Sequence, residues 1–490
     1  MSPAPPQEFL LLLPEIVLAV GGMVLLVLGS LGRGISNRVA ATGSLIAVAV
    51  TALLVFWVQG RAPVGDPILA GMFILDAYAL FWKVVLLLAT ALTILLSVRF
   101  MDEGEYRAGE YYSLILLATT GMLFMVSGFH LLSIWISLEL MALSSYILAG
   151  YFKHEIRSNE AALKYFVLGA LSSGILLYGL SLIYGGTGTL SLSDLPQGLI
   201  AATSEGNLLV GVGWILLAVG LFFKISAVPF HVWTPDVYVG APTPVTGYLA
   251  AASKAASFAV LIRIFIQGLG PVVVDWQVIV AAVASLSMIW GNIAALTQTN
   301  VKRMLAYSSI AHAGYMLLGL LAASATGLWA AMFYALAYTF ITLGAFGTVI
   351  LLERREYAGE TLGDYAGLAQ RAPLLASLML VFLLALTGIP PTGGFFGKVY
   401  LFAAAVEAGW TWVAVIGVLT SAISLYYYMG IVVQMYFKDS EETTPVPLRS
   451  PLLGATLIFC AVATVILGIF PGFFVDFARS SILPIAWNLF

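Results

Sequence analysis

Long apolar runs dominate this chain and constrain its fold more than any other feature. A helix needs roughly 20 apolar residues to cross the hydrocarbon core of a bilayer, and runs of about this length follow one another along the whole sequence. Hydrophobic residues make up 61% of the 490 residues and charged residues only 9%, where about 25% charged is usual for a soluble protein. The pattern predicts an all-α polytopic membrane protein without a soluble domain.

Glycine, proline and charged residues divide the apolar sequence into about fourteen membrane spans. The predicted spans are 9–31, 39–57, 75–98, 111–127, 131–151, 161–184, 208–235, 242–266, 276–296, 301–322, 327–352, 373–408, 412–435 and 452–470. We group them into an N-terminal three-helix segment (1–110), a first repeat of spans four to eight (111–266), a second repeat of spans nine to thirteen (276–435) and a C-terminal helix (436–490).

Prolines interrupt two of the predicted spans. The seventh contains GLFFKISAVPFHVWTPD and the twelfth contains LALTGIPPTGGFFGK. Pro229 cannot donate a hydrogen bond to the carbonyl of Ile225. In the same way, the pair at 390–391 leaves the carbonyls of Leu386 and Thr387 without helical donors. Both spans are therefore predicted to be broken helices.

The two breaks lie five spans apart, which suggests an internal repeat. We expect Gly393 and Gly394 to unwind the second break further. Broken helices at bilayer depth are tolerated where protein buries them or where they line a wet cavity. Units with an odd number of spans alternate in direction, so the sequence predicts two inverted five-helix repeats, a pattern typical of transporters.

Basic residues gather in the loops that follow odd-numbered spans. These loops carry Arg33, Arg38, Arg99, Arg107, Lys153, Arg157, Lys302, Arg303, Arg354, Arg355, Arg371, Lys438 and Arg449. The opposite loops carry Arg61, Arg263 and Arg479. The positive-inside rule then predicts that the first set is cytoplasmic and that both termini lie outside. No basic residue precedes Arg33, so the N-terminus predicts a retained first span rather than a cleaved signal peptide.

Several classes of site are excluded by what the sequence lacks. Its one cysteine, Cys460, is too few for an iron–sulfur cluster, a cysteine-based zinc site or a disulfide framework. No Walker motif and no GxGxxG after a strand is present, so no nucleotide site is evident. The net charge of −3 gives no reason to expect nucleic acid. We therefore expect no cofactor or metal in this chain.

Lysine and arginine are distributed differently relative to the spans. Every arginine lies in a loop or near the end of a span. The lysines within spans are Lys83, Lys164, Lys224, Lys254 and Lys398. Arginine does not release its proton in proteins, whereas a buried lysine does so readily. The difference favours proton transfer, rather than packing, as the reason for these charges.

Further titratable groups lie at membrane depth, and each has a structural alternative. A charge within a span costs at least about 2.5–3.5 kcal/mol and usually marks an ion pathway. Glu139 and Lys224 form either a pathway or a structural ion pair. Lys254, among small residues, favours a functional role. His231 is either a relay group or a cap of the broken helix, and His312 is either a relay group or a hydrogen-bonded core histidine.

The remaining intramembrane candidates lie nearer to span ends. Lys398 follows the second break, and its alternative role is to extend its ammonium group to the interface. Lys164, near a cytoplasmic end, has the same alternative. A structural role is favoured for Lys83, and Glu15 is predicted to be an interfacial carboxylate. The tyrosines at 426–428 are predicted to be packing or interface residues.

Several segments resemble the antiporter-like membrane subunits of respiratory complex I. The stretch KISAVPFHVWTPDVYVGAPTPVTGYLAAASKAA (224–256) and the stretch NVKRMLAYSSIAHAGYMLLG (300–319) resemble these subunits and related cation/proton antiporters. SIWISLELMALSSYILAGY and SNEAALKYFVLGALSSGILLYG resemble the N-type subunit in particular. The resemblance covers about residues 100 to 430.

This resemblance implies a proton pathway made of particular residues. In the family, a glutamate in the fifth span, lysines in the seventh and eighth, and a lysine or glutamate in the twelfth carry the proton. These positions match Glu139, Lys224, Lys254 and Lys398, with His231, His312 and Lys164 as further relay candidates. Lysine at 398 distinguishes the chain from the M-type, which has glutamate there, and the absence of a lateral helix distinguishes it from the L-type.

The resemblance also implies partners and cofactors. The chain would be a multi-pass inner-membrane subunit of a bacterial NADH-quinone oxidoreductase, beside M-type, L-type and small membrane subunits. NADH, FMN, iron–sulfur clusters and quinone would bind to partner subunits. A subunit of a multisubunit Na⁺/H⁺ antiporter is the main alternative. A structural scaffold whose charges only hold helices together, and a solute transporter, are weaker alternatives.

Overall fold

The computed structural model describes residues 6–31, 35–61, 65–104, 108–353, 359–440 and 450–483, with only the backbone at 6, 7, 103 and 104. Part of the basic set used to predict orientation lies outside these ranges, as does the C-terminal residue. The positions concerned are Arg33, Arg107, Arg354, Arg355, Arg449 and Phe490.

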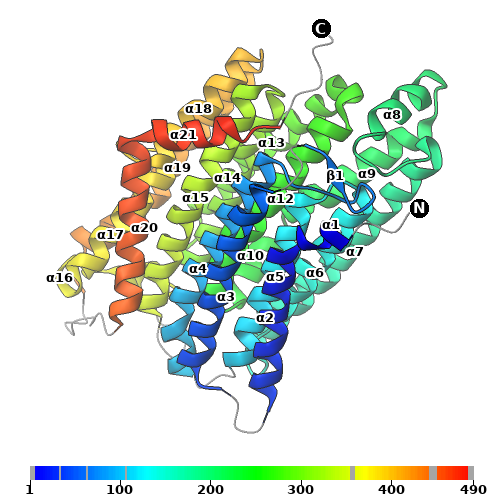
Figure 1. Ribbon diagram of the computed structural model, residues 1–490. Coiled ribbons are helices and arrows are strands. Elements are labelled where there is room, and N and C mark those ends of the chain that lie inside the picture. The colour runs from blue at the N-terminus through cyan, green and yellow to red at the C-terminus, as the bar shows by residue number, and fades with distance from the viewer. Residues whose placement is uncertain are drawn as a thin grey trace.

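Helices that run roughly side by side make up the body of the protein (Figure 1). Within the described ranges, twelve helical segments are long and apolar enough to cross a membrane. Ten are single helices: α2 (Leu13–Ser30), α3 (Asn37–Gln59), α4 (Ala77–Gly104), α5 (Ala108–Ser127), α6 (Leu131–Ala149), α7 (Ile156–Thr187), α14 (Val301–Leu321), α15 (Ala325–Leu352), α19 (Thr411–Phe437) and α20 (Pro451–Ile469).

The other two are composite segments. One joins α11 (Thr243–Tyr248), the π-helical turn η1 (Leu249–Ser253), α12 (Lys254–Arg263) and the second π-helical turn η2 (Ile264–Gly268). The other joins the 3₁₀ turn η3 (Gly270–Val272) to α13 (Val273–Leu296). The polytopic helical fold predicted from the apolar runs is thus confirmed.

Two further apolar helices are too short to cross a membrane alone, and each ends at a predicted break. α9 (Leu208–Lys224) is followed by α10 (Trp233–Gly240), and α17 (Pro373–Thr387) is followed by α18 (Gly393–Glu407). Both interruptions contain the prolines that predicted them.

The prediction for Gly393 and Gly394 was wrong. Both residues belong to α18 instead of unwinding the chain. A Cβ atom at 394 would lie 2.0 Å from the carbonyl oxygen of Ala385, and one at 393 would lie 2.8 Å from Leu467 Cβ. These glycines are therefore needed because α18 packs closely against its neighbours.

Polar side chains begin several of the helices. Ser36, Asn300, Ser324 and Thr392 each accept a hydrogen bond from a backbone N–H in the first turn of α3, α14, α15 and α18. Such caps satisfy donors that have no partner within the helix. The cap at Thr392 also fixes where the chain becomes helical again after the second break.

Short elements complete the described chain, and the sequence did not predict them. They are α1 (Pro6–Leu10), β1 (Pro67–Ile68), β2 (Phe73–Ile74), α8 (Leu195–Ser204), the 3₁₀ turn η4 (Leu362–Tyr365), α16 (Leu368–Arg371) and α21 (Pro471–Ser480). The strands β1 and β2 pair antiparallel and form the two-stranded sheet.

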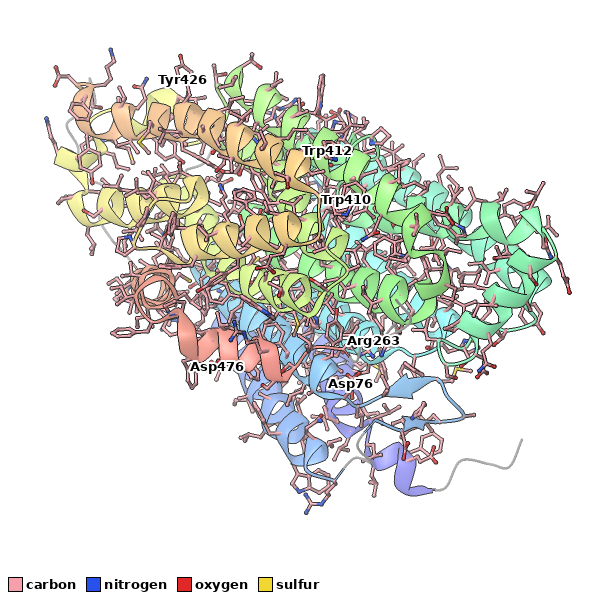
Figure 2. All side chains as sticks on the ribbon, turned by 90° about the horizontal axis from the view of Figure 1, so that it is seen from above. Asp76, Arg263, Trp410, Trp412, Tyr426 and Asp476 are labelled. Atoms are coloured by element: carbon pink, nitrogen blue, oxygen red, sulfur yellow. The ribbon has the colours of Figure 1, made fainter. Side chains whose placement is uncertain are left out.

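Several of these short elements gather at one end of the bundle. The backbone N–H of Leu69, in the hairpin, donates to Glu8 of α1, and Phe477 of α21 packs on Phe81 near the start of α4. In Figure 1, α21 crosses the ends of the long helices at this end. Asp76 and Arg263 lie together there (Figure 2), joined by two hydrogen bonds of 2.8 and 2.9 Å.

The helices differ in how deeply they are buried. The apolar windows of α15 and of the composite segment 243–268 are completely buried inside the protein, and that of α14 is 94% buried. The windows of α2, α3 and α19 are only 33% buried. α14, α15 and 243–268 therefore form the centre of the bundle, where solvent and lipid are excluded.

Candidate functional site

Buried lysines lie at irregular points of three segments. Lys224 is the last residue of α9, Lys254 follows the π-helical turn η1, and Lys398 lies near the start of α18. Their exposed fractions are 4%, 1% and 3%. Helix ends and π-helical turns leave backbone groups without regular partners and occur often at functional sites. These three side chains therefore lie where a helix cannot satisfy all of its own polar groups.

Glu139 and Lys224 are not in direct contact. Glu139, on α6, accepts a hydrogen bond from Ser173 of α7, whose hydroxyl also accepts one from Trp135. Lys224 donates to the hydroxyl of Tyr146 at 3.4 Å. Tyr146 lies on α6, two turns beyond Glu139. The direct ion pair considered from the sequence is thus not formed between these two residues.

The side chain of Lys254 is hydrogen-bonded to α14, one of the most deeply buried helices. Its ammonium group donates to the carbonyl oxygen and to the hydroxyl of Ser309, both at 2.7 Å. Ser253, one residue earlier, donates to the sulfur of Met141 on α6 at 3.6 Å. Lys254 therefore lies between α6, on the side of Glu139, and α14, on the side of Lys398.

One face of α14 carries polar groups from Lys254 towards Lys398. Residues three apart on a helix are neighbours, and Ser309, His312 and Tyr315 have this spacing. They cover about 9 Å along the axis. The ring of Tyr315 lies 4.7 Å from the ammonium nitrogen of Lys398, so α14 contacts both lysines.

His312 lies in the middle of this face and is hydrogen-bonded on both ring nitrogens. Nδ1 pairs with the hydroxyl of Tyr334 at 2.5 Å, and Nε2 pairs with the hydroxyl of Tyr428 at 3.2 Å. The Tyr428 hydroxyl is also bonded to Ser308. A histidine with hydroxyl partners on both nitrogens can receive a proton at one and release one at the other. The geometry suits a relay, although it equally satisfies a buried histidine.

Lys398 compensates the second break. Its ammonium group donates to the carbonyl oxygens of Leu386 and Thr387, at 2.8 and 2.9 Å, and to the hydroxyl of Ser421 at 2.8 Å. These two carbonyls are those that the prolines leave without a helical donor. Cationic groups are favoured at the negative end of a helix. Gly388, with φ +90°, makes room, because a Cβ atom there would lie 3.0 Å from Lys398 Cδ.

Lys83 differs from these three lysines because it forms a buried ion pair. Its ammonium nitrogen lies 2.5 Å from Glu15, and both side chains are buried. Glu15 was predicted to be interfacial, but its exposed fraction is 0%, so that prediction was wrong. By contrast, Lys224, Lys254 and Lys398 form no ion pair within 4.0 Å with any carboxylate of the described residues. Their partners are neutral.

The two remaining relay candidates lie apart from this row. His231 is partly exposed and packs edge-on against Trp290 of α13, with ring centroids 6.3 Å apart. Lys164 is 41% exposed and pairs with Asp236 at 2.6 Å and with Glu160 at 2.7 Å. The structure therefore does not bring either residue into contact with Lys224, Lys254 or Lys398.

Hydroxyl partners are the part of the site that sequence reasoning missed. Tyr427 and Tyr428 were predicted to be packing or interface residues, and both are buried, as packing residues would be. The prediction did not include their hydrogen bonds: Tyr427 bonds to Asn292 and Tyr428 to His312. Tyr426 is 75% exposed, as an interface residue would be. Small hydroxyl residues such as Ser173 and Ser309 occur throughout the chain, so no sequence signal distinguished them.

Comparison with known proteins identifies the family. The family described as "NADH:quinone oxidoreductase/Mrp antiporter, TM" matches residues 128–424. The NADH-quinone oxidoreductase subunit N of Trichlorobacter lovleyi is 42% identical over 480 residues, which cover 96% of each chain. Subunit N 2 of Rhizobium meliloti is 45% identical, again over 96% of each chain. The chain belongs to the family of NADH-quinone oxidoreductase N subunits.

Solved structures show the same arrangement of helices. A chain of respiratory complex I from Thermus thermophilus with bound aureothin is 35% identical, with a TM-score of 0.79, and the match covers 95% of this chain and 99% of that one. A chain of the Mrp complex from a Dietzia species has a TM-score of 0.83 at 22% identity, over 97% of both chains. The second likeness shows the fold alone.

Proposed function

We propose that this chain translocates protons across the bacterial inner membrane as the N-type membrane subunit of an NADH-quinone oxidoreductase. Its relatives of that name match it over nearly their full length. The enzyme activity belongs to the complex, and proton translocation by this chain is coupled to electron transfer from NADH to quinone. NADH, FMN, iron–sulfur clusters and quinone bind to partner subunits.

One observation carries the proposal: Lys224, Lys254 and Lys398 are buried with neutral partners, while the buried lysines at 83 and 302 each have a carboxylate. A buried ammonium group without a counter-ion is costly, and losing its proton removes the cost. A lysine held only by hydroxyl and carbonyl groups is thus able to cycle between its charged and neutral forms. Lys83 instead has the counter-charge of a carboxylate 2.5 Å away.

The pathway runs through the row of buried groups. Glu139 favours the protonated form of Lys224 by its charge, without direct contact. Among the described residues no hydrogen bond joins Lys224 to Lys254, so water carries the proton between them. From Lys254 it moves along Ser309 and His312 on α14 to Lys398, whose contact with α14 is the ring of Tyr315.

The proposed topology has fourteen spans. The pairs α9–α10 and α17–α18 each complete one crossing, in addition to the twelve long segments. Spans four to eight (111–266) and nine to thirteen (276–435) form the inverted repeats, with 1–110 and 436–490 outside them. The bias of basic residues supports a cytoplasmic location for the end that carries Lys302 and Arg303, and both termini in the periplasm.

Replacing Lys254 by arginine tests whether it carries a proton. Arginine keeps the charge but does not deprotonate, because its pKa exceeds about 12. We expect Lys254→Arg to abolish proton pumping almost as completely as Lys254→Ala. Pumping is measured in inverted membrane vesicles and normalised to assembled complex. Near-native pumping by the arginine variant, beside an inactive alanine variant, would contradict the relay.

A further inference from the structure

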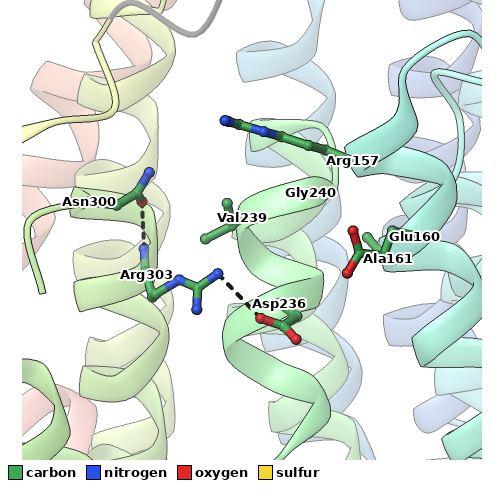
Figure 3. A pocket seen from close by; sticks show the side chains of 8 residues that line it. All are labelled: Arg157, Glu160, Ala161, Asp236, Val239, Gly240, Asn300 and Arg303. Carbon is green, nitrogen blue, oxygen red and sulfur yellow. Dashed lines mark hydrogen bonds and ion pairs between the residues drawn. The ribbon is translucent and has the colours of Figure 1, made fainter.

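A polar pocket opens at the end of the bundle that carries most of the basic residues. Its volume is about 330 Å³, and it lies between α7, α10 and the start of α14 (Figure 3). Its polar lining is Arg157, Glu160, Asp236, Asn300 and Arg303. Arg303 pairs with Asp236 at 3.2 Å, and Lys164 joins Asp236 to Glu160. The pocket thus combines charges of both signs at a surface open to water.

A buried carboxylate lies directly behind the pocket. Glu360 is 2% exposed, and two residues of the pocket lining reach it: Asn300 donates to it at 3.0 Å, and Arg157 lies 3.7 Å from it. On the inner side, the ammonium nitrogen of Lys302 lies 3.4 Å from Glu360 and also donates to the carbonyl oxygen of Ala241. Glu360 therefore connects the pocket with a buried lysine.

A second carboxyl group, that of Glu353, lies near Lys302 and Glu360. Glu353, just after α15, has an Oε2 atom that is shielded from solvent, and the hydroxyl of Thr243 lies close to its carboxyl group. Burial raises the pKa of the Glu353 carboxyl, and the charge of Lys302 opposes this shift. The other charged groups that act on Glu353 are Glu360 and Glu155.

Polar groups continue from this cluster towards Lys254. Ser309, the partner of Lys254, lies seven residues after Lys302 on α14, which is about 10.5 Å along one face of the helix. The buried hydroxyl of Tyr238 lies close to the hydroxyl of Ser309, between this cluster and Lys254. Buried polar groups whose hydrogen-bonding capacity is not filled by protein are the groups that bind internal water.

We propose that Glu353 and Glu360, together with Lys302, form a proton-loading site that takes protons from the pocket and supplies Lys254. This inference rests on the proposed function. A hydronium ion in the pocket protonates one carboxylate and leaves as water. The carboxylic acid then returns its proton, through water beside Tyr238, to the neutral amine of Lys254, which becomes ammonium. The ammonium group of Lys302 is the cationic partner of the two carboxyl groups.

The cluster also has a structural role, which the test must separate from loading. The backbone N–H of Val301 donates to the carbonyl oxygen of Glu360 at 2.7 Å, and that of Leu362 donates to Thr299 at 2.9 Å. These backbone bonds persist when a carboxylate is replaced by the amide of the same shape. Glu353→Gln and Glu360→Gln therefore remove titration while keeping most of the packing.

The experiment measures proton pumping by the complete complex in inverted membrane vesicles over a range of pH. We expect the double variant Glu353→Gln/Glu360→Gln to lose pumping by about fivefold or more at alkaline pH, and less at acidic pH, where protons reach Lys254 without a loading site. The infrared difference spectrum of the purified complex should also lose a protonated carboxyl band in Glu353→Gln. Glu205→Gln, on an exposed residue after α8, is the matched control and should leave both measurements unchanged.

The outcomes separate this inference from the proposed function. A double variant with the native pH profile, beside an inactive Lys254→Ala, would overturn the loading site and leave the pathway intact. Loss of pumping by the same factor at every pH would also overturn it, because a purely structural cluster has that effect. Normal pumping by Lys254→Ala would instead contradict the proposed function itself.

Discussion

Breaking the Glu15–Lys83 pair tests the distinction between structural and proton-carrying lysines. Both side chains are almost completely buried and their charged atoms are 2.5 Å apart. Removing one partner of such a pair costs about 3–5 kcal/mol, because the other charge stays buried alone. This is roughly two to three and a half orders of magnitude in the folding equilibrium. Replacing both by apolar residues of similar volume leaves no buried charge, and the cost is then close to zero.

We therefore expect Glu15→Leu alone and Lys83→Met alone to lower the amount of assembled complex strongly, and the double variant to restore it. The assay is the amount of complex in membranes and its activity after heating, followed by pumping per assembled complex. The restored double variant should pump normally. A double variant that assembles without pumping would place the pair on the proton pathway and refute the reasoning. Single variants as stable as the double variant would show that the pair does not stabilise the fold.

Three other predictions follow from the row of buried groups and its surroundings. Gly388→Ala should lower both pumping and the stability of the complex, because alanine at this positive φ costs about 1–3 kcal/mol. The control Gly430→Ala has open space around it and should change neither measurement. Glu139→Ala should slow pumping and quinone reduction severalfold while assembly continues, and normal pumping would remove Glu139 from the pathway. A tag fused after Phe490 should react with an impermeant reagent from the periplasm, and protection in intact spheroplasts, with reactivity in inverted vesicles, would reverse the topology.

Local chemistry determined which parts of the structure were predictable. Prolines remove specific donors, so the broken helices at 229 and 390–391 followed from the sequence. The buried position of Lys254 followed from the apolar run around it. The partner of Glu15 was not predictable, because α2 and α4 are joined through tertiary packing. The π-helical turn η1 was missed as well, since no residue type in LAAAS demands it.

The loading cluster was missed for a related reason. Glu353 and Glu360 follow a long apolar span and look like ordinary loop residues in the sequence. In the described chain, the pairing of Asn300 with Thr361 across two loops brings Glu360 to the start of α14. Long-range contacts of this kind leave no periodic signal, whereas helix length and helix breakers do.

The hydrogen bonds at the second break depend on whether Lys398 is protonated. An ammonium group has three donors, and here all three are used, on Leu386, Thr387 and Ser421. A neutral amine has two donors and one lone pair, so one of the three acceptors must be released or must become a donor. Only the Ser421 hydroxyl can reverse its role, because a carbonyl oxygen never donates. Each departing proton therefore either turns the Ser421 hydroxyl away from the Thr387 carbonyl, to which it donates at 3.1 Å, or releases one of the two carbonyls from Lys398. In both cases the end of α17 responds to the charge state of one nitrogen atom.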